Sequence, residues 1–174
     1  IRIRISSIEP NLLDDNIIEL IGKSKKFVNH FHIPLQSGND KILKSMSRKY
    51  DSNLYCEKIS KIRKEINNSC IGADVIVGHP GETKKDFEKT LKFIKNIKLN
   101  YLHVFPYSQR DNTRSNKFGD TVPLKTKNER SKILRSLSDK LRRNFYEKNI
   151  NKEHSVLFED KIKENYIHGF TENY

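Results

Sequence analysis

Cysteine is scarce in this chain, and long apolar runs are missing from it. Only two cysteines, Cys56 and Cys70, occur among the 174 residues, and their spacing matches no zinc or iron–sulfur pattern. Two thiols also do not make a disulfide framework, so we expect a pair of reduced cytosolic thiols. No run of about 18 apolar residues is present, which argues against a membrane-spanning helix.

Repeats, low-complexity tracts and nucleophile motifs are missing as well. The sequence contains nothing like a nucleophile elbow or a catalytic triad. It opens with Ile1-Arg2-Ile3-Arg4-Ile5, an alternation that is typical of a strand and unlike a secretory signal. A chain that starts inside a strand suggests a fragment of a longer protein.

Basic residues are in clear excess. Lys and Arg number 34 against 22 Asp and Glu, which gives a net charge of +12. One interpretation is a solvated, lysine-rich surface. The other, which we favour, is a polyanionic partner whose phosphates the basic side chains neutralise. Charge alone does not distinguish RNA from DNA.

Strand and helix patterns alternate over the first 105 residues. We predict strands at 1–8, 30–35, 71–77 and 101–105. The helices between them are expected to begin at Asp14, at Asn39 or Asp40, at Asp51, and at Thr83, which forms a capping box with Asp86. This alternation predicts an α/β fold with parallel strands and right-handed crossovers, and short strands favour a barrel-like sheet.

The pattern changes after the last of these strands. Residues 106–125 read as a polar loop, and a helix is predicted at 126–148. Its buried stripe would be Leu134, Leu137, Leu141 and Phe145, with Arg130 among the basic residues of its other faces. We therefore divide the chain into an α/β domain at 1–150 and a small β domain at 151–174, which is too short for an independent core.

The ends of the four strands are the expected place for a ligand, because parallel α/β folds bind ligands there. The loops concerned are 6–10, 32–40, 74–83 and 103–113, and we expect them to meet on one rim. Gly78 and Gly81 would let a backbone approach a ligand, although a tight strand-to-helix turn is by itself the better explanation of them. His32, His79 and His103 are more simply three unrelated histidines than a metal site completed by Asp74.

The four loops resemble successive motifs of the radical S-adenosylmethionine methylthiotransferases. The motifs are Ile5-Ser6-Ser7-Ile8-Glu9-Pro10, His32-Ile33-Pro34-Leu35-Gln36-Ser37-Gly38, Asp74-Val75-Ile76-Val77-Gly78-His79-Pro80-Gly81-Glu82-Thr83 and Phe105-Pro106-Tyr107-Ser108-Gln109-Arg110. The ending Gly169-Phe170-Thr171-Glu172-Asn173-Tyr174 resembles the TRAM domain, a small RNA-binding β-barrel. Within the family, 102–108 and this ending look most like the branch that acts on threonylcarbamoyladenosine.

The resemblance implies a partial TIM-type barrel followed by the start of a TRAM domain. It also implies a cytoplasmic enzyme that adds a methylthio group to carbon 2 of the adenine beside the anticodon of tRNA. S-adenosylmethionine, 4Fe–4S clusters and an electron donor would be needed. The cluster motif Cys-x-x-x-Cys-x-x-Cys is missing from the chain, so we expect these 174 residues alone to be inactive.

Roles for individual residues follow from the same resemblance. Around S-adenosylmethionine it places Gln36, Ser37, Asp74, Val77, Gly78, Pro106 and Tyr107. Arg110 would face the substrate nucleotide or its threonyl carboxylate. Contacts to tRNA phosphates would come from Arg142, Arg143 and Lys148.

Other functions remain open from the sequence. Relatives in the same family modify isopentenyladenosine in tRNA or an aspartate of a ribosomal protein. Outside it, the basic helix and β tail are compatible with a non-catalytic RNA-binding module. A barrel enzyme that binds a phosphorylated metabolite at 78–83 is a third possibility.

Overall fold

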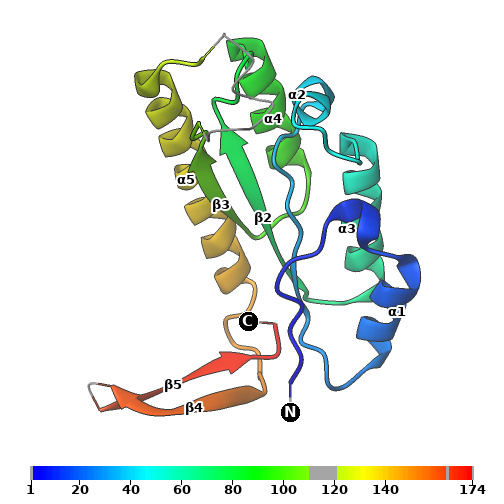
Figure 1. Ribbon diagram of the computed structural model, residues 1–174. Helices are drawn as coiled ribbons and strands as arrows, with labels where there is room; N and C mark the ends of the chain where they lie inside the picture. The colour runs from blue at the N-terminus through cyan, green and yellow to red at the C-terminus, as the bar shows by residue number, and fades with distance from the viewer. Residues whose placement is uncertain (1, 110–120, 164, 174) are drawn as a thin grey trace.

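A computed structural model describes residues 2–109, 121–163 and 165–173 of the chain (Figure 1). Its elements, in order, are η1 (Pro10–Leu12), α1 (Asp15–Lys23), β1 (His30–His32), α2 (Asp40–Ser45), α3 (Ser52–Glu65), β2 (Cys70–Val77), α4 (Lys84–Asn96), β3 (Tyr101–Pro106), α5 (Leu124–Glu147), β4 (Val156–Lys163) and β5 (Tyr166–Thr171). None of the helices in the described ranges is both long and apolar enough to cross a membrane.

The main sheet is parallel, as the alternation of strands and helices predicts. Its order is β1-β2-β3, with β2 hydrogen-bonded on both sides. Gly72 lies opposite Tyr101 and Val77 opposite Pro106 in the pairing of β2 with β3. Beyond β1, the chain continues alongside β2 as far as a bridge between Gln36 and Val75.

The strand predicted at 1–8 is wrong as a regular element. Ile3 forms an isolated parallel bridge with Phe27, and the Ile8 amide donates to the His32 carbonyl oxygen over 3.1 Å. The segment therefore follows 27–32 but is bonded to it only at separate points. Alternating side chains predict which face each residue takes, but they do not supply a continuous hydrogen-bonding partner.

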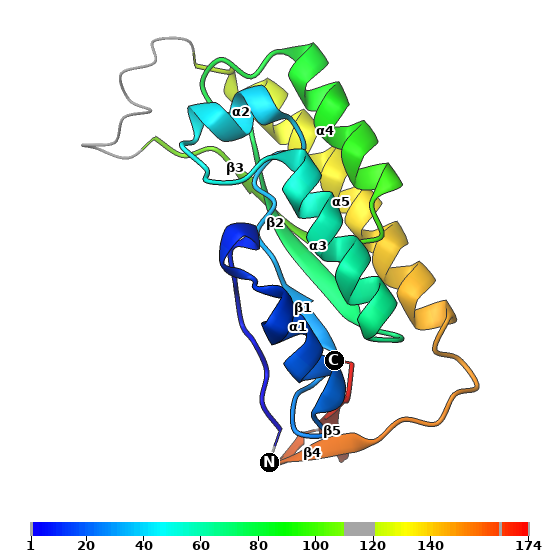
Figure 2. The same ribbon diagram turned by 90° about the vertical axis from the view of Figure 1, so that its right-hand side faces the viewer.

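Strand β2 separates an apolar face from a polar one. Four alternate residues are fully buried in the core: Ile71, Ala73, Val75 and Val77. The same core contains side chains of α3, α4 and α5, and Figure 2 shows these helices on one side of the sheet. On the other face, Gly72 leaves room for the Tyr101 ring, because a Cβ there would lie 2.0 Å from the Tyr101 Cζ atom.

The predicted helix starts are confirmed. The side chains that accept a hydrogen bond from the first turn are Asp14, Asn39, Asp51 and Thr83. Thr83 and Asp86 form the predicted capping box. These short polar side chains satisfy amides that have no partner within the helix, so they define where each helix begins.

Helix α5 is a single long helix that begins two residues before the predicted start at 126. Leu134 and Phe145 of the predicted stripe are buried, whereas Leu137 and Leu141 are only partly so. Ser138 accepts from the Leu102 amide over 2.8 Å and donates to the Leu102 carbonyl over 3.1 Å. This pair of bonds fixes the middle of α5 against β3.

The last two strands form an antiparallel hairpin. It lies beyond the end of the main sheet at which the strands begin (Figure 1). The Glu172 carbonyl accepts from the Asn29 amide over 2.7 Å, and the Phe170 carbonyl accepts from Arg2 over 2.8 Å. The hairpin agrees with the β structure predicted at 151–174, and its assignment to a TRAM domain stays a prediction.

Asp86 should make the fold sensitive to acid. Its carboxylate accepts from Thr83, from the Asn39 side chain over 2.9 Å and from Lys41 over 3.1 Å. Burial alone would raise the pKa of Asp86, but the bonds from Thr83 and Lys41 and the Lys41 charge outweigh it and lower that pKa from 3.8 to about 2. The carboxylate therefore stabilises the fold above pH 4, and this stabilisation, about 2 kcal/mol, is lost as the pH falls through about 2.

We expect Asp86→Asn to lower the free energy of unfolding by about 2 kcal/mol at pH 6 and by about half of that at pH 3. Urea unfolding at the two pH values measures both differences. Exposed Glu88→Gln on the same helix is the control and should change little. An equal loss in Asp86→Asn at both pH values would show that the carboxylate charge does not contribute.

Candidate active-site rim and basic groove

The loops that follow the three strands meet at one end of the sheet. The Gln36 amide donates to the Asp74 carbonyl over 2.8 Å, and the Ile76 amide donates to the Gln36 carbonyl over 2.9 Å. The Tyr107 amide donates to the Val77 carbonyl over 2.8 Å. Three of the predicted loops therefore share one rim. The fourth begins where Ile8 bonds to His32, which is paired with Gly72 nearer the start of β2, so its contact lies away from that rim.

Gln36 and Ser37 sit next to each other on this rim, and both are buried. Gln36 adopts a left-handed backbone with φ of 62°, which is uncommon for a residue with a side chain and is often found at functional sites. Ser37 is fully buried, and its hydroxyl lies 3.1 Å from the Thr90 hydroxyl and accepts from the Asn39 amide. Ser37 therefore holds the loop in place, while Gln36 is the residue whose conformation needs a functional explanation.

A buried ion pair anchors the loop after β2. The Glu82 carboxylate accepts from the Gly78 amide over 2.7 Å and pairs with Arg130 of α5, and both side chains are almost completely buried. Burial raises the pKa of Glu82, although the Gly78 amide and the Arg130 charge oppose that rise. Gly78 has a φ of +74°, so the turn requires a residue without a side chain.

Arg130 was predicted on one of the faces of its helix away from the buried stripe, and this is wrong. Arg130 is 7% exposed, and its guanidinium lies 5.4 Å from the centroid of the Phe87 ring. It precedes buried Leu134 by one helical turn, so it lies on the buried stripe rather than beside it. The four-residue spacing between Arg130 and Leu134 indicates that Arg130 faces the core. Glu82 in the motif 74–83 offers an acidic partner, so the two together could have predicted the buried pair.

Tyr107 carries a polar atom without a partner. Its hydroxyl is buried and makes no hydrogen bond in the described part of the chain. Its ring packs edge-on to His79 at 5.4 Å, and the Lys127 amine lies 5.2 Å from the ring centroid. Because buried hydroxyls nearly always have a partner, the Tyr107 hydroxyl is available to hydrogen-bond a ligand at the rim.

The other residues predicted at the rim differ in accessibility. Pro106 is exposed at the end of β3, and a Cβ on Gly81 would meet no atom within 4 Å. The Val77 side chain is buried in the core, so only its backbone reaches the rim. Arg110 lies outside the described residues.

Two of the three histidines, His32 and His103, lie close to the same carboxylate, whereas we expected the three to be unrelated. His32 Nε2 lies 2.9 Å from Asp74 Oδ1, and His103 Nδ1 lies 3.5 Å from the same oxygen. Burial alone would raise the pKa of Asp74, but the hydrogen bonds and charges of His32 and His103 together outweigh it, and the pKa is lowered. His79 instead hydrogen-bonds the Pro80 carbonyl over 3.0 Å.

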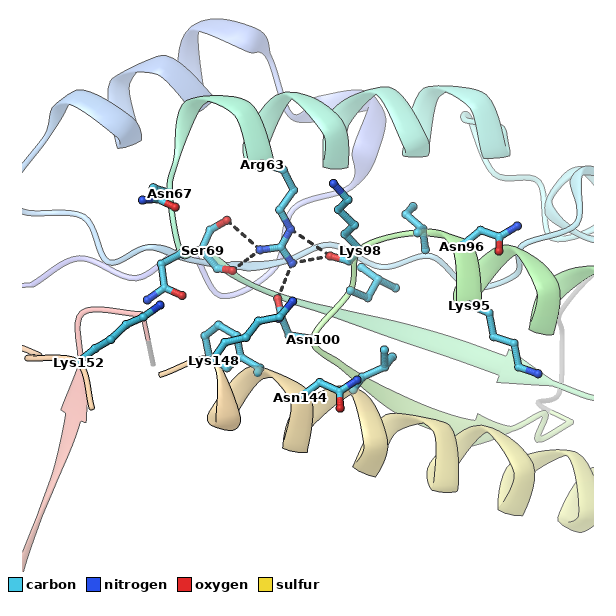
Figure 3. Close-up of a pocket in the computed structure, with 15 residues that line it drawn as sticks. Arg63, Asn67, Ser69, Lys95, Asn96, Lys98, Asn100, Asn144, Lys148 and Lys152 are labelled. Carbon is cyan, nitrogen blue, oxygen red and sulfur yellow. Dashed lines mark hydrogen bonds between the residues drawn. The ribbon is translucent and has the colours of Figure 1, made fainter. Parts of the chain in front are cut away.

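A basic groove lies at the opposite end of the sheet, between α3 and the C-terminal part of α5 (Figure 3). Its volume is about 790 Å³, and its lining includes the lysines Lys95, Lys98, Lys148 and Lys152. Arg63 donates to the Ser69 and Lys98 carbonyl oxygens and to the Asn100 side chain, so it holds the wall together (Figure 3). The lysines supply a positive lining that suits a polyanion.

The three residues predicted to contact tRNA phosphates do not share this groove. Lys148 lines it. Arg142 lies over the Tyr101 ring, 5.8 Å from its centroid, and lines a smaller pocket beside Arg4 and His103. Arg143 is exposed on α5 and lines neither pocket. The sequence did not reveal Lys95 and Lys98, because their place in the groove depends on how α4 packs beside α3 and α5.

Comparison with known proteins shows which family the chain resembles. The family model of the radical SAM superfamily matches residues 1–94. Threonylcarbamoyladenosine tRNA methylthiotransferase MtaB of Bacillus subtilis is 42% identical over 99% of this chain, which corresponds to 39% of that protein. The protein of the same name from Aquifex aeolicus is also 42% identical, over 99% of this chain and 41% of its own length.

A second kind of enzyme is similar over the same range. The tRNA-2-methylthio-N(6)-dimethylallyladenosine synthase of Clostridium botulinum is 37% identical over 99% of this chain and 36% of its own length. The chain thus spans about two fifths of the curated relatives that it matches. Among solved structures, the radical SAM enzyme HemN, coproporphyrinogen III oxidase of Escherichia coli, aligns with a TM-score of 0.66 at 18% identity, over 80% of this chain and 32% of HemN, which supports the fold alone.

Proposed function

The chain belongs to the radical SAM superfamily, and we propose that it is part of a tRNA methylthiotransferase that acts on N6-threonylcarbamoyladenosine. The observation that carries the proposal is the 42% identity, over 99% of the chain, to two enzymes named for that substrate. The synthases that act on dimethylallyladenosine are less similar, at 37% identity. An enzyme of this kind would work on tRNA in the cytoplasm.

The rim fits S-adenosylmethionine, which superfamily members use together with a 4Fe–4S cluster. This ligand has a ribose, an adenine and an amino acid end, and each needs hydrogen-bond partners. The unpaired Tyr107 hydroxyl and Gln36, with its left-handed backbone, provide polar groups, and the space beside Gly81 is open. When bound, the two cofactors would supply the radical chemistry that activates carbon 2 of the substrate adenine in tRNA.

The two cysteines do not fit a cluster. Cys56 is exposed on α3, and burial raises the pKa of the Cys70 thiol to about 12, whereas a cluster ligand must be a thiolate. Cys70 begins β2, at the end of the sheet opposite the rim. We therefore expect the cluster ligands, and the contact with an electron donor, in parts of the full-length protein that this chain does not span.

The chain's own residues would bind and orient the cofactor. The Gln36 amide would hydrogen-bond the ribose or the amino acid end, and Ser37 would support it by fixing the loop. Gly78 and the Val77 backbone would approach the adenine closely, with Pro106 and Tyr107 flanking its ring. Asp74 would close the wall below them, and Arg110 would face the substrate nucleotide.

The basic groove would hold the tRNA backbone. Its four lysines lie far from the rim, so they would position the RNA rather than touch the modified base. Exposed Arg143 on the same helix and Arg142 beside the groove would extend the contact. The β4–β5 hairpin, interpreted as the start of a TRAM domain, would add to it.

Nucleoside mass spectrometry of tRNA tests the proposed activity. We expect cells without the full-length gene to lose 2-methylthio-threonylcarbamoyladenosine and to accumulate its unthiolated precursor. Complementation with the wild-type gene should restore the mark and is the control. Loss of a different methylthio mark would retain the family but contradict the substrate, and no change in any mark would favour the non-catalytic RNA-binding module.

The groove makes a separate prediction about RNA affinity. In the full-length protein, Lys98→Gln with Lys148→Gln should weaken tRNA binding and lower the salt dependence of the affinity by about one to two phosphate contacts. Filter binding over a series of salt concentrations measures both quantities. Lys25→Gln with Lys26→Gln removes the same charge from exposed positions at the end of α1 and should leave the salt slope unchanged. An equal effect of the two pairs would mean that only net charge matters.

A further inference from the structure

We propose that His32, Asp74 and His103 form a site for a divalent transition-metal ion on the polar face of the sheet. This inference goes beyond the proposed function and does not depend on it. The three residues come from three neighbouring strand segments, and each contributes one ligand atom. All three ligand atoms lie within 4.8 Å of one another.

The register of the sheet brings these side chains together. Asp74 and His103 are direct partners in the pairing of β2 with β3. His32 pairs with Gly72, which precedes Asp74 by two residues and therefore points to the same face. The cluster is thus fixed by backbone hydrogen bonds rather than by mobile loops.

The distances suit a coordination shell. Bonds from zinc to nitrogen or oxygen are about 2.0–2.2 Å, so neighbouring ligand atoms in a tetrahedral or octahedral shell are roughly 3.0–3.5 Å apart. His32 Nε2 and His103 Nδ1 lie 2.9 Å and 3.5 Å from Asp74 Oδ1. Two imidazoles and one carboxylate suit Zn²⁺, Co²⁺ or Fe²⁺ better than Mg²⁺ or Ca²⁺, which prefer oxygen ligands.

The surroundings of the cluster orient the His32 ring and leave Asp74 and His103 accessible to an ion. The Tyr101 hydroxyl lies 3.4 Å from His32 Nδ1, so it can hold the ring with Nε2 toward the site, as outer partners of metal-bound histidines do. The exposed fractions of the side chains rise from 9% for His32 to 25% for Asp74 and 51% for His103. An ion can therefore enter beside His103, and positions remain open for water or a ligand.

A hydrogen-bonded histidine–aspartate network without an ion is the alternative. It would need the same short distances but would give no defined metal stoichiometry. The two possibilities differ in whether one equivalent of metal binds through these three side chains. Titration of the 174-residue chain with Zn²⁺ or Co²⁺ separates them, in a Cys56→Ser background that removes the exposed thiol.

We expect one equivalent of Zn²⁺ to bind, measured by calorimetry and elemental analysis, and Co²⁺ to give visible absorption bands. His103→Ala, at a half-exposed position that should not disturb folding, is expected to weaken binding by about tenfold or more, and Asp74→Asn likewise. His79→Ala removes a rim histidine outside the cluster and should not change the affinity. Circular dichroism confirms that each variant is folded.

Absence of binding, or equal affinity in wild type and His103→Ala, would overturn the proposal. Zinc counted in the full-length protein, with iron determined separately, gives an independent measurement. There, His103→Ala should lower the zinc content while the iron content stays the same. Unchanged zinc in that variant would also contradict the site.

Discussion

The double-sided pairing of β2 is the constraint on which the rest of the structure depends. Its register with β1 and β3 sends Val75 and Val77 into the apolar core beneath three helices. The same register sends Asp74 to the opposite face, beside His32 and His103. A slip of one residue would exchange the two sets, so burial of the core also specifies the polar face. Site and core are therefore consequences of a single pairing.

A second constraint acts at the rim, where the buried Glu82–Arg130 pair ties the loop after β2 to α5. A buried ion pair is weak evidence for stability, because desolvation of both charges offsets their attraction. Its clearer consequence is that it holds the loop after β2 in a fixed position against α5. The Glu82 carboxylate also holds the Gly78 amide, and the Lys127 amine donates to the Tyr107 carbonyl over 3.1 Å. Helix α5 thus fixes both loops that would flank the adenine of the cofactor.

The sequence predicted what depends on local pattern and missed what depends on packing. The three parallel strands, the helix caps and the shared rim of three loops follow from periodicity, short polar side chains and the parallel α/β rule, and these agree with the structure. The missing strand at 1–8, buried Arg130 and the enclosed Ser37 hydroxyl depend on which segments lie side by side. The approach of His32 to His103, 71 positions later, depends on strand register, which no local pattern contains.

Equilibrium binding of S-adenosylmethionine to the full-length protein tests most directly whether this rim is the cofactor site. Gln36→Ala removes one side-chain amide from the rim, and we expect it to weaken binding by roughly tenfold, the loss of one or two hydrogen bonds. Asn53→Ala, an exposed amide on α3, is the matched control and should leave the affinity unchanged. A folded Gln36→Ala variant that binds S-adenosylmethionine as tightly as the wild type would contradict the assignment.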